Sequence, residues 1–216
     1  MKRRTYNVRE TTFENNFRIV SCNIRSLRKH FKDLLCEVIL VQQTCLEKNE
    51  DTAKYSLPNF LTHFVNVGNG KGLALYYTEK FSVSTVCATE QYQIAKIESD
   101  EFDIISVYRS SDSNQSKQYN FSKQVLSMVN EYKKTLILGD FNCSALVNTD
   151  NAIVRSIENS GFIQAVQKPT HIQGGLIDHT YDSHHIATEL LQVTQKAVYY
   201  TDHDVMELSI AGENSV

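Results

Sequence analysis

The chain is poor in the features that mark membrane proteins and disulfide-rich proteins. It has only two prolines, Pro58 and Pro169, and no apolar run near the roughly 18 residues that cross a bilayer. Its five cysteines are an odd number without a CxxC pair, which indicates neither a disulfide framework nor a zinc site. No apolar stretch follows the basic start of the chain, so no targeting signal is indicated. These absences predict a soluble, intracellular protein with reduced thiols and no membrane partner.

The 216 residues, of which 41% are hydrophobic and 22% charged, have the length and balance of one globular domain. We expect a flexible N-terminal arm over residues 1–16 and a single domain over 17–216. A net charge of −3 argues against a broadly basic surface that coats nucleic acid. Any contact with DNA would therefore be local.

Apolar periodicity predicts interleaved strands and helices without a repeat. Buried strands are expected at 17–22 and 37–43, a helix between them at 26–36, and a meander of about five strands between 60 and 108. Further helices are expected at 116–132 and 151–161, a strand at 135–142, and strands at 176–183, 189–200 and 205–210. The pattern predicts an α/β fold in which two β-sheets pack face to face with helices outside.

Polar residues stand at or just beyond the ends of these apolar strands, where a sandwich can gather side chains into one cleft. They are Asn23, Gln43, Tyr108, Asp140, Asn142, Asp178, Asp202 and His203. Taken singly each is a weak signal, since an Asp-His pair is ordinarily a loop and Asn23 could cap the helix that follows. Their joint order along the chain carries more weight.

That order resembles the endonuclease/exonuclease/phosphatase family over roughly residues 17–210. The stretches VYRSS, LILGDFN, 161–181 and TDHDVMEL are similar to the endonuclease domains of non-LTR (LINE-type) retrotransposons, more than to apurinic endonucleases, DNase I or sphingomyelinases. The resemblance implies a four-layered, DNase I-like sandwich with two mixed sheets. It also implies a metal-dependent phosphodiesterase whose partner is DNA, which it nicks.

The resemblance also implies roles for individual residues. Asp140 would orient and deprotonate the attacking water, with Asn142 and Asn23 donating hydrogen bonds to phosphate or to Asp140. Tyr108 would offer its hydroxyl to the phosphate. His203 would contact the phosphate as well. The sequence leaves open whether Asp140 or His203 is the general base.

Three further residues complete the expected site. Asp178 would hold the ring of His203, and Asp202 would bind the metal directly or through water. Arg109 follows the key tyrosine and would either touch DNA or lie on the surface as an ordinary loop arginine. By contrast, His179, His184 and His185 lack ligand spacing, and Ser110 and Ser111 lack a nucleophile signature.

The expected cofactor is Mg²⁺, with Mn²⁺ possible, because the cluster offers carboxylate and amide oxygens. One position departs from the family, which reads LQET where this chain has Val41-Gln42-Gln43-Thr44. Gln43 thus occupies the position of the family's metal-binding glutamate, and its neutral amide makes a poorer site for a hard cation. Activity should fall steeply. Since the other motif positions remain, we favour an isolated substitution in an otherwise competent nuclease over general decay.

Two functions from different classes therefore stand. The first is a DNA endonuclease of the retrotransposon type that is attenuated or inactivated by Gln43. It would have further domains if it belongs to a longer polyprotein, and it would be nuclear if it acts on chromosomal DNA. The alternative is a catalytically inactive nucleic-acid-binding module. A lipid or inositol-phosphate phosphatase is less favoured, because residues 161–181 have no counterpart that we recognise there.

Overall fold

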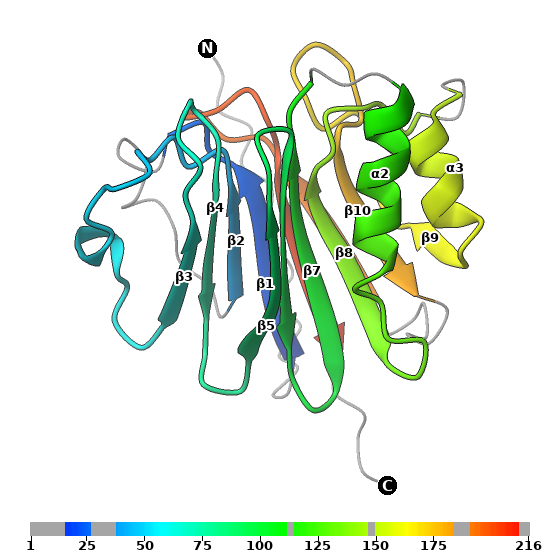
Figure 1. The fold of residues 1–216 in the computed structure, drawn as a ribbon. Coiled ribbons are helices and arrows are strands. Elements are labelled where there is room, and N and C mark those ends of the chain that lie inside the picture. The colour runs from blue at the N-terminus through cyan, green and yellow to red at the C-terminus, as the bar shows by residue number, and fades with distance from the viewer. Residues whose placement is uncertain (1–15, 27–37, 112–114, 147–149, 184–190, 212–216) are drawn as a thin grey trace, which may run out of the picture.

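The computed structural model describes residues 16–26, 38–111, 115–146, 150–183 and 191–211, and builds them into two six-stranded sheets (Figure 1). The first sheet has the order β11 (Leu191–Lys196), β12 (Val205–Ala211), β1 (Asn16–Asn23), β2 (Val38–Gln42), β4 (Leu73–Tyr77) and β3 (Leu61–Val65). The second has the order β5 (Ser82–Ala88), β6 (Tyr92–Glu98), β7 (Phe102–Arg109), β8 (Lys134–Asp140), β10 (Asp178–Ser183) and β9 (Phe162–Gln164). Both are mixed: β1 and β2 are parallel, β7 and β8 are parallel, and the remaining pairs are antiparallel.

The sheets pack face to face because alternate strand residues of each are apolar and point inward. Leu40 and Leu75 of the first sheet share one buried cluster with Ile104, Leu136 and Leu138 of the second. Each is fully buried, which contributes roughly 1.5–3 kcal/mol per side chain. This shared core fixes how the two sheets are aligned.

Helices α2 (Gln115–Leu126) and α3 (Ala152–Glu158) lie side by side over the outer face of the second sheet (Figure 1). Phe121 and Val125 of α2 and Ile153 and Ile157 of α3 join the buried cluster on that face. The Asn151 side chain caps α3 by accepting a hydrogen bond from the Ile153 amide at 2.9 Å. None of the described helices is long and apolar enough to cross a membrane.

Loops and the short 3₁₀-helix η2 (Ala53–Tyr55) pack on the outer face of the first sheet, where Tyr55 and Leu46 meet Tyr76. The helix expected at 26–36 falls almost wholly outside the described residues. The predicted fold class is nevertheless confirmed, since two mixed sheets pack face to face with helices outside.

The five strands expected between 60 and 108 are present, but they do not form one meander. β4 is already paired with β2 on one side and β3 on the other, so no edge remains for β5. The chain instead turns at Thr78–Phe81 and crosses to the second sheet, and Phe81 packs against Phe17 of the first sheet and Phe102 of the second.

Two boundaries also differ from expectation. The helix expected at 116–132 ends at Leu126, because the amides of Met128 and Val129 bond three residues back and the Asn130 side chain accepts from the Tyr132 amide. The arm expected over 1–16 lies outside the described residues except for Asn16, which pairs with Ala211 in β1 and β12. The three-residue strand β9 was not predicted.

Candidate functional site

One end of the sandwich gathers the polar residues that the sequence placed at strand ends. β1, β2, β7 and β8 finish there, and the antiparallel strands β10 and β12 begin there. A cleft of about 610 Å³ opens at this end. Seven of the eight expected residues line it: Asn23, Gln43, Tyr108, Asp140, Asn142, Asp202 and His203. The eighth, Asp178, is buried behind His203.

Asp140, at the end of β8, is fully buried and held on both carboxylate oxygens. Its Oδ2 accepts hydrogen bonds from Asn23 Nδ2 at 2.7 Å and Asn142 Nδ2 at 3.0 Å, and its Oδ1 accepts from the Asn142 amide at 2.8 Å. Burial, followed by the charge of Asp178, raises the pKa of Asp140 well above its ordinary value, although His203 and these hydrogen bonds oppose the shift. A carboxylate with this raised pKa is suited to take a proton near neutral pH.

Gly139 lets β8 come close enough to β7 to place Asp140. Its φ is +138°, and a Cβ at this position would lie 2.0 Å from the Val107 carbonyl oxygen. The register then sets Asp140 beside Tyr108 of β7 and Asp178 of β10. Tyr108 is buried except for the part that lines the cleft.

Arg109 does not face the cleft as a substrate-binding residue would. It is 3% exposed, and its guanidinium donates to the carbonyl oxygens of Phe141 at 2.5 Å and Asn142 at 2.8 Å. The Arg109 carbonyl in turn accepts from Asn142 Nδ2 at 2.7 Å. Arg109 therefore holds the turn after β8, in which Asn142 adopts the left-handed φ of 46°.

His203 and Asp178 form a buried pair at the back of the cleft. His203 Nδ1 lies 2.9 Å from Asp178 Oδ2, which leaves Nε2 directed toward the cleft. Burial lowers the pKa of His203, but the hydrogen bond and charge of Asp178, with the charges of Asp140 and Asp202, outweigh burial and raise the pKa above its ordinary value. The ring is thereby biased toward its charged form, which can donate to a phosphate oxygen.

Gln43, and not Gln42, faces the cleft. Gln42 is fully buried in β2 and donates to Ser21 Oγ at 3.1 Å. Gln43 follows with a left-handed φ of 53° and lines the cleft. The structure thus places the Gln43 amide in the cleft, and its equivalence to the metal-binding glutamate of the family stays a prediction.

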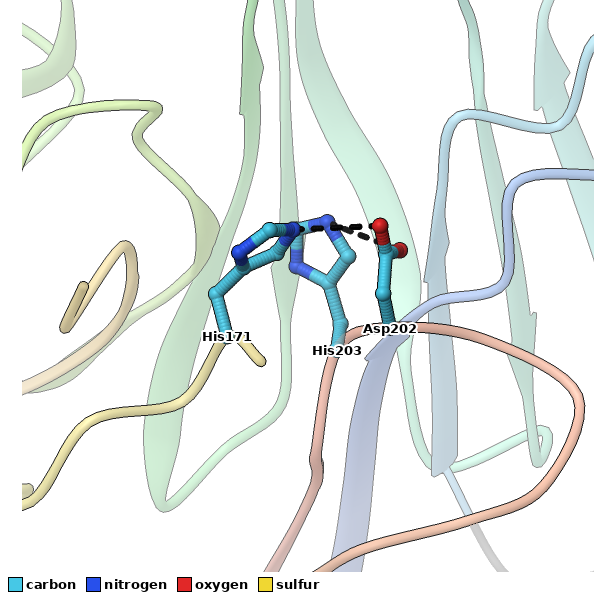
Figure 2. A group of neighbouring side chains, drawn as sticks. All are labelled: His171, Asp202 and His203. Atoms are coloured by element: carbon cyan, nitrogen blue, oxygen red, sulfur yellow. Dashed lines mark ion pairs between the residues drawn. The ribbon is translucent and has the colours of Figure 1, made fainter. Parts of the chain in front are cut away.

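Asp202 lies at the cleft among three cationic or ionisable side chains. Its Oδ2 is 2.7 Å from Arg25 Nη1 and 3.2 Å from His171 Nε2, and its Oδ1 is 3.9 Å from His203 Nε2. Burial raises the pKa of Asp202, but a backbone hydrogen bond and the charges of Arg25, His203 and His171 outweigh it and leave the pKa below its ordinary value. Figure 2 shows both imidazole rings directed toward this carboxylate.

Sequence reasoning missed Arg25, His171 and Lys71, all of which line the cleft. Arg25 is two residues from Asn23, so its place in the same loop could have been inferred. Nothing in the spacing links His171 to His203. The tertiary fold joins their backbones in an antiparallel bridge. It also brings the centroids of the two rings to 4.7 Å from each other.

Acidic and imidazole side chains of the cleft could hold a metal ion, but Gln43 and Asp202 fit Mg²⁺ poorly. Asp202 Oδ1 is buried and has no hydrogen-bond partner among the described residues, which suits a cation. However, Arg25 already balances the charge on Oδ2, and Gln43 supplies only a neutral oxygen. Hard divalent cations bind best where several anionic oxygens meet.

His179, unlike His171 and His203, does not line the cleft. His179 is buried, stacks on Phe141, and places Nε2 2.8 Å from the Cys143 carbonyl oxygen. Burial lowers its pKa to about 4, which keeps the ring neutral. His184 and His185 are outside the described residues. The four described cysteines, Cys22, Cys45, Cys87 and Cys143, are thiols.

No family model and no curated protein matches this chain. Among solved structures it is similar to an AP endonuclease from Archaeoglobus fulgidus, with 14% identity, a TM-score of 0.73 and coverage of 91% of this chain and 100% of the other. It is similar to a 3′ phosphatase from Neisseria bound to a product DNA hairpin, with 14% identity, a TM-score of 0.69 and coverage of 90% and 99%. It is also similar to the endonuclease domain of TRAS1, a telomere-specific non-LTR retrotransposon, with 14% identity, a TM-score of 0.65 and coverage of 90% and 98%.

The fold is therefore that of the DNase I-like, endonuclease/exonuclease/phosphatase proteins, as the family resemblance implied. Its structural neighbours are nucleases and phosphatases.

Proposed function

We propose that this chain is a DNA-nicking phosphodiesterase domain whose activity is attenuated by Gln43. The observation that carries the proposal is the pairing, in one cleft, of a buried carboxylate held by two amides with a buried carboxylate–imidazole pair. Phosphodiester hydrolysis needs a proton acceptor for the attacking water and a donor for the phosphoryl oxygens. Asp140 and His203 supply these two roles.

In this proposal Asp140 accepts the proton of the attacking water, because burial and Asp178 raise its pKa while Asn23 and Asn142 hold it in place. His203, held by Asp178, donates from Nε2 to a phosphoryl oxygen as negative charge develops. Tyr108 adds a hydroxyl at the same end of the second sheet. Arg25 and Lys71 provide positive charge along the cleft for the neighbouring phosphates.

DNA is proposed as the substrate because the similar Neisseria phosphatase was solved with a DNA hairpin and TRAS1 is a retrotransposon protein. The VYRSS, LILGDFN and TDHDVMEL stretches favour the retrotransposon type. Such a nick would expose a 3′ hydroxyl for reverse transcription primed at the target. The polymerase would be another domain of a longer polyprotein or a separate protein.

A second candidate, a binding module that holds DNA without cutting it, is favoured by one feature. Gln43 removes a negative charge from the cleft, and Arg25 balances another on Asp202, so the ground-state repulsion of phosphate is reduced. A supercoiled-plasmid nicking assay with Mg²⁺, Mn²⁺ and EDTA separates the two candidates. We expect slow or no nicking by this form and metal-dependent nicking by Gln43→Glu.

If Gln43→Glu also fails to nick DNA yet binds it, the binding module stands and the catalytic proposal fails. Gln42→Glu is not a suitable control because that side chain is buried. Gln173→Glu adds the same charge elsewhere at the cleft and should not restore nicking.

A further inference from the structure

We propose that His171, Asp202 and His203 form a binding site for one divalent ion that prefers imidazole ligands, with Zn²⁺ as the reference ion. This goes beyond the proposed cleavage, since it concerns an ion other than Mg²⁺ and a residue, His171, with no part in that chemistry. The three ligand atoms come from two loops that the fold brings together, the turn before β10 and the segment before β12 (Figure 2).

The spacing of the three side chains suits such an ion. Their ligand atoms all lie within 4.8 Å of one another. Zn²⁺ binds nitrogen and carboxylate oxygen at about 2.0–2.2 Å, so tetrahedral ligand atoms stand roughly 3.3–3.6 Å apart. His171 Nε2 lies 3.2 Å from Asp202 Oδ2, and His203 Nε2 lies 3.9 Å from Asp202 Oδ1. Small side-chain rotations would complete the arrangement.

The surroundings orient these ligands. Asp178 holds His203 Nδ1 at 2.9 Å, which fixes the ring and leaves Nε2 for the ion, as carboxylates do for histidines at metal sites. The bridge between His171 and His203 fixes the two backbones, supported by hydrogen bonds from the Ile172 amide to the Asp202 carbonyl and from the Asp204 amide to the Thr170 carbonyl. The buried Asp202 Oδ1 has no hydrogen-bond partner among the described residues and lies 3.9 Å from His203 Nε2.

Binding requires a defined movement of protons and of one side chain. His203 releases its Nε2 proton to solvent and keeps the Nδ1 proton that it donates to Asp178. His171 binds through Nε2 and carries its remaining proton on Nδ1, giving up the 3.2 Å contact from the Gln173 amide in an exposed turn. Arg25, whose side chain is 57% exposed, leaves Asp202 Oδ2 and is solvated by water.

The donor set decides which ions bind. Two imidazoles and one carboxylate suit Zn²⁺, Co²⁺ or Ni²⁺, whereas Mg²⁺ prefers an octahedron of oxygens. The site should therefore bind Zn²⁺ far more tightly than Mg²⁺, and Gln43→Glu should change the affinity for Zn²⁺ little.

The test uses the full chain and measures binding directly, so its outcome is independent of nicking. Zn²⁺ and Mg²⁺ are titrated by calorimetry, and Co²⁺ by visible absorption, which reports ligand type. We expect one Zn²⁺ per chain, at least about a 10-fold loss of Zn²⁺ affinity in His171→Gln, and about a 10- to 100-fold loss in Asp178→Asn through the ring of His203. Far-UV circular dichroism checks that each variant is folded.

The matched controls are His63→Gln on β3, which does not line the cleft, and the double change His184→Gln with His185→Gln, which removes two imidazoles that are consecutive in the sequence. Both should keep parental Zn²⁺ affinity. The proposal is overturned if His171→Gln binds Zn²⁺ as the parent does, if the double variant loses binding instead, or if Co²⁺ shows a sulfur charge-transfer band that assigns the ligands to cysteines.

Discussion

At the scale of single residues, the site works through environments that shift two proton equilibria in the same direction. Burial raises the pKa of Asp140, and the carboxylate of Asp178 raises the pKa of His203. Asp178 contributes to both shifts without facing the cleft. The expected consequences concern activity, pH dependence and stability.

In a Gln43→Glu background, Asp140→Ala and His203→Ala should each lower the single-turnover nicking rate by about 10²- to 10⁴-fold. DNA affinity should change little, because Asp140 repels the ground-state phosphate and His203 supplies one contact among several. Fluorescence anisotropy at fixed salt, beside the nicking assay, measures both quantities. Ser111→Ala, at the cleft margin, serves as the control and should retain both. Near-parental cutting by either alanine variant would remove that residue from the mechanism.

The pH profile of nicking should depend on Asp178. Activity needs Asp140 ionised and His203 protonated, so it rises with pH through the pKa of Asp140 and falls through the pKa of His203. Because the charge of Asp178 raises both values, Asp178→Asn should move both limbs to lower pH. Asp182→Asn, on the same strand, is the control and should leave both limbs in place. A profile that Asp178→Asn leaves unmoved would show that these two groups do not govern the rate.

Arg109 should matter for stability, since its guanidinium satisfies the carbonyls of Phe141 and Asn142 inside the protein. Arg109→Met removes these donors and should lower the free energy of unfolding by about 1–3 kcal/mol. Lys80→Met, at an exposed position of the turn between β4 and β5, should have almost no effect. Urea denaturation of the three proteins checks the difference, and equal midpoints would mean that water replaces the guanidinium without cost.

At the scale of elements, the strands were the most predictable part of the chain because their apolar runs are long and regular. The ends of β1, β2, β7 and β8 were found within one or two residues, and with them the cleft positions of Asn23, Gln43, Tyr108 and Asp140. β9 was missed because three residues carry no periodicity. The end of α2 was missed because Met128 and Val129 continue the apolar spacing beyond the helix.

Partner choice between elements was harder to predict. Local periodicity does not say that β2 pairs with β4, so the crossing from β4 to β5 could not be foreseen. For the same reason His171 was missed and the burial of Arg109 was not foreseen: His171 joins the site through a tertiary bridge, and Arg109 is buried against the turn after β8. The order of motif residues along the chain identified those residues, but it did not identify the residues that lie next to them in the folded protein.

The contact between β7 and β8 gives a prediction for Gly139. Gly139→Ala would bring a Cβ to 2.0 Å from the Val107 carbonyl oxygen, so β8 must separate from β7 or the chain must fail to fold. Gly174→Ala is the matched control, because its φ is also positive but nothing lies within 4 Å of the added Cβ. It should cost only the backbone strain of about 1–2 kcal/mol. Thermal unfolding of both variants tests the contact, and equal losses would show that β8 shifts without penalty.

At the scale of the whole molecule, the charge distribution limits how the protein can hold DNA. The net charge is −3, and among the described residues the cations that line the cleft are Arg25 and Lys71 besides the histidines. Binding should neutralise about two phosphates, so log K should fall against log salt with a slope of about −2. Titrations between low and physiological salt measure it. Lys71→Gln should reduce the slope by about one, whereas Lys80→Gln, away from the cleft, should not. A slope several times steeper would locate DNA on another surface.

The hydrogen bond from Asn23 to Asp140 makes the site sensitive to sheet alignment, because it joins two separate sheets. Asn23 ends β1 in the first sheet and Asp140 ends β8 in the second, and 2.7 Å separates their side-chain atoms. A slip of one sheet along the other by about an ångström would stretch this bond beyond the range of a hydrogen bond. The Asn23–Asp140 hydrogen bond therefore forms only when the two sheets are correctly aligned. Substitutions deep in the shared core, such as Leu136→Val, should therefore alter the orientation of Asp140 as well as lower the melting temperature.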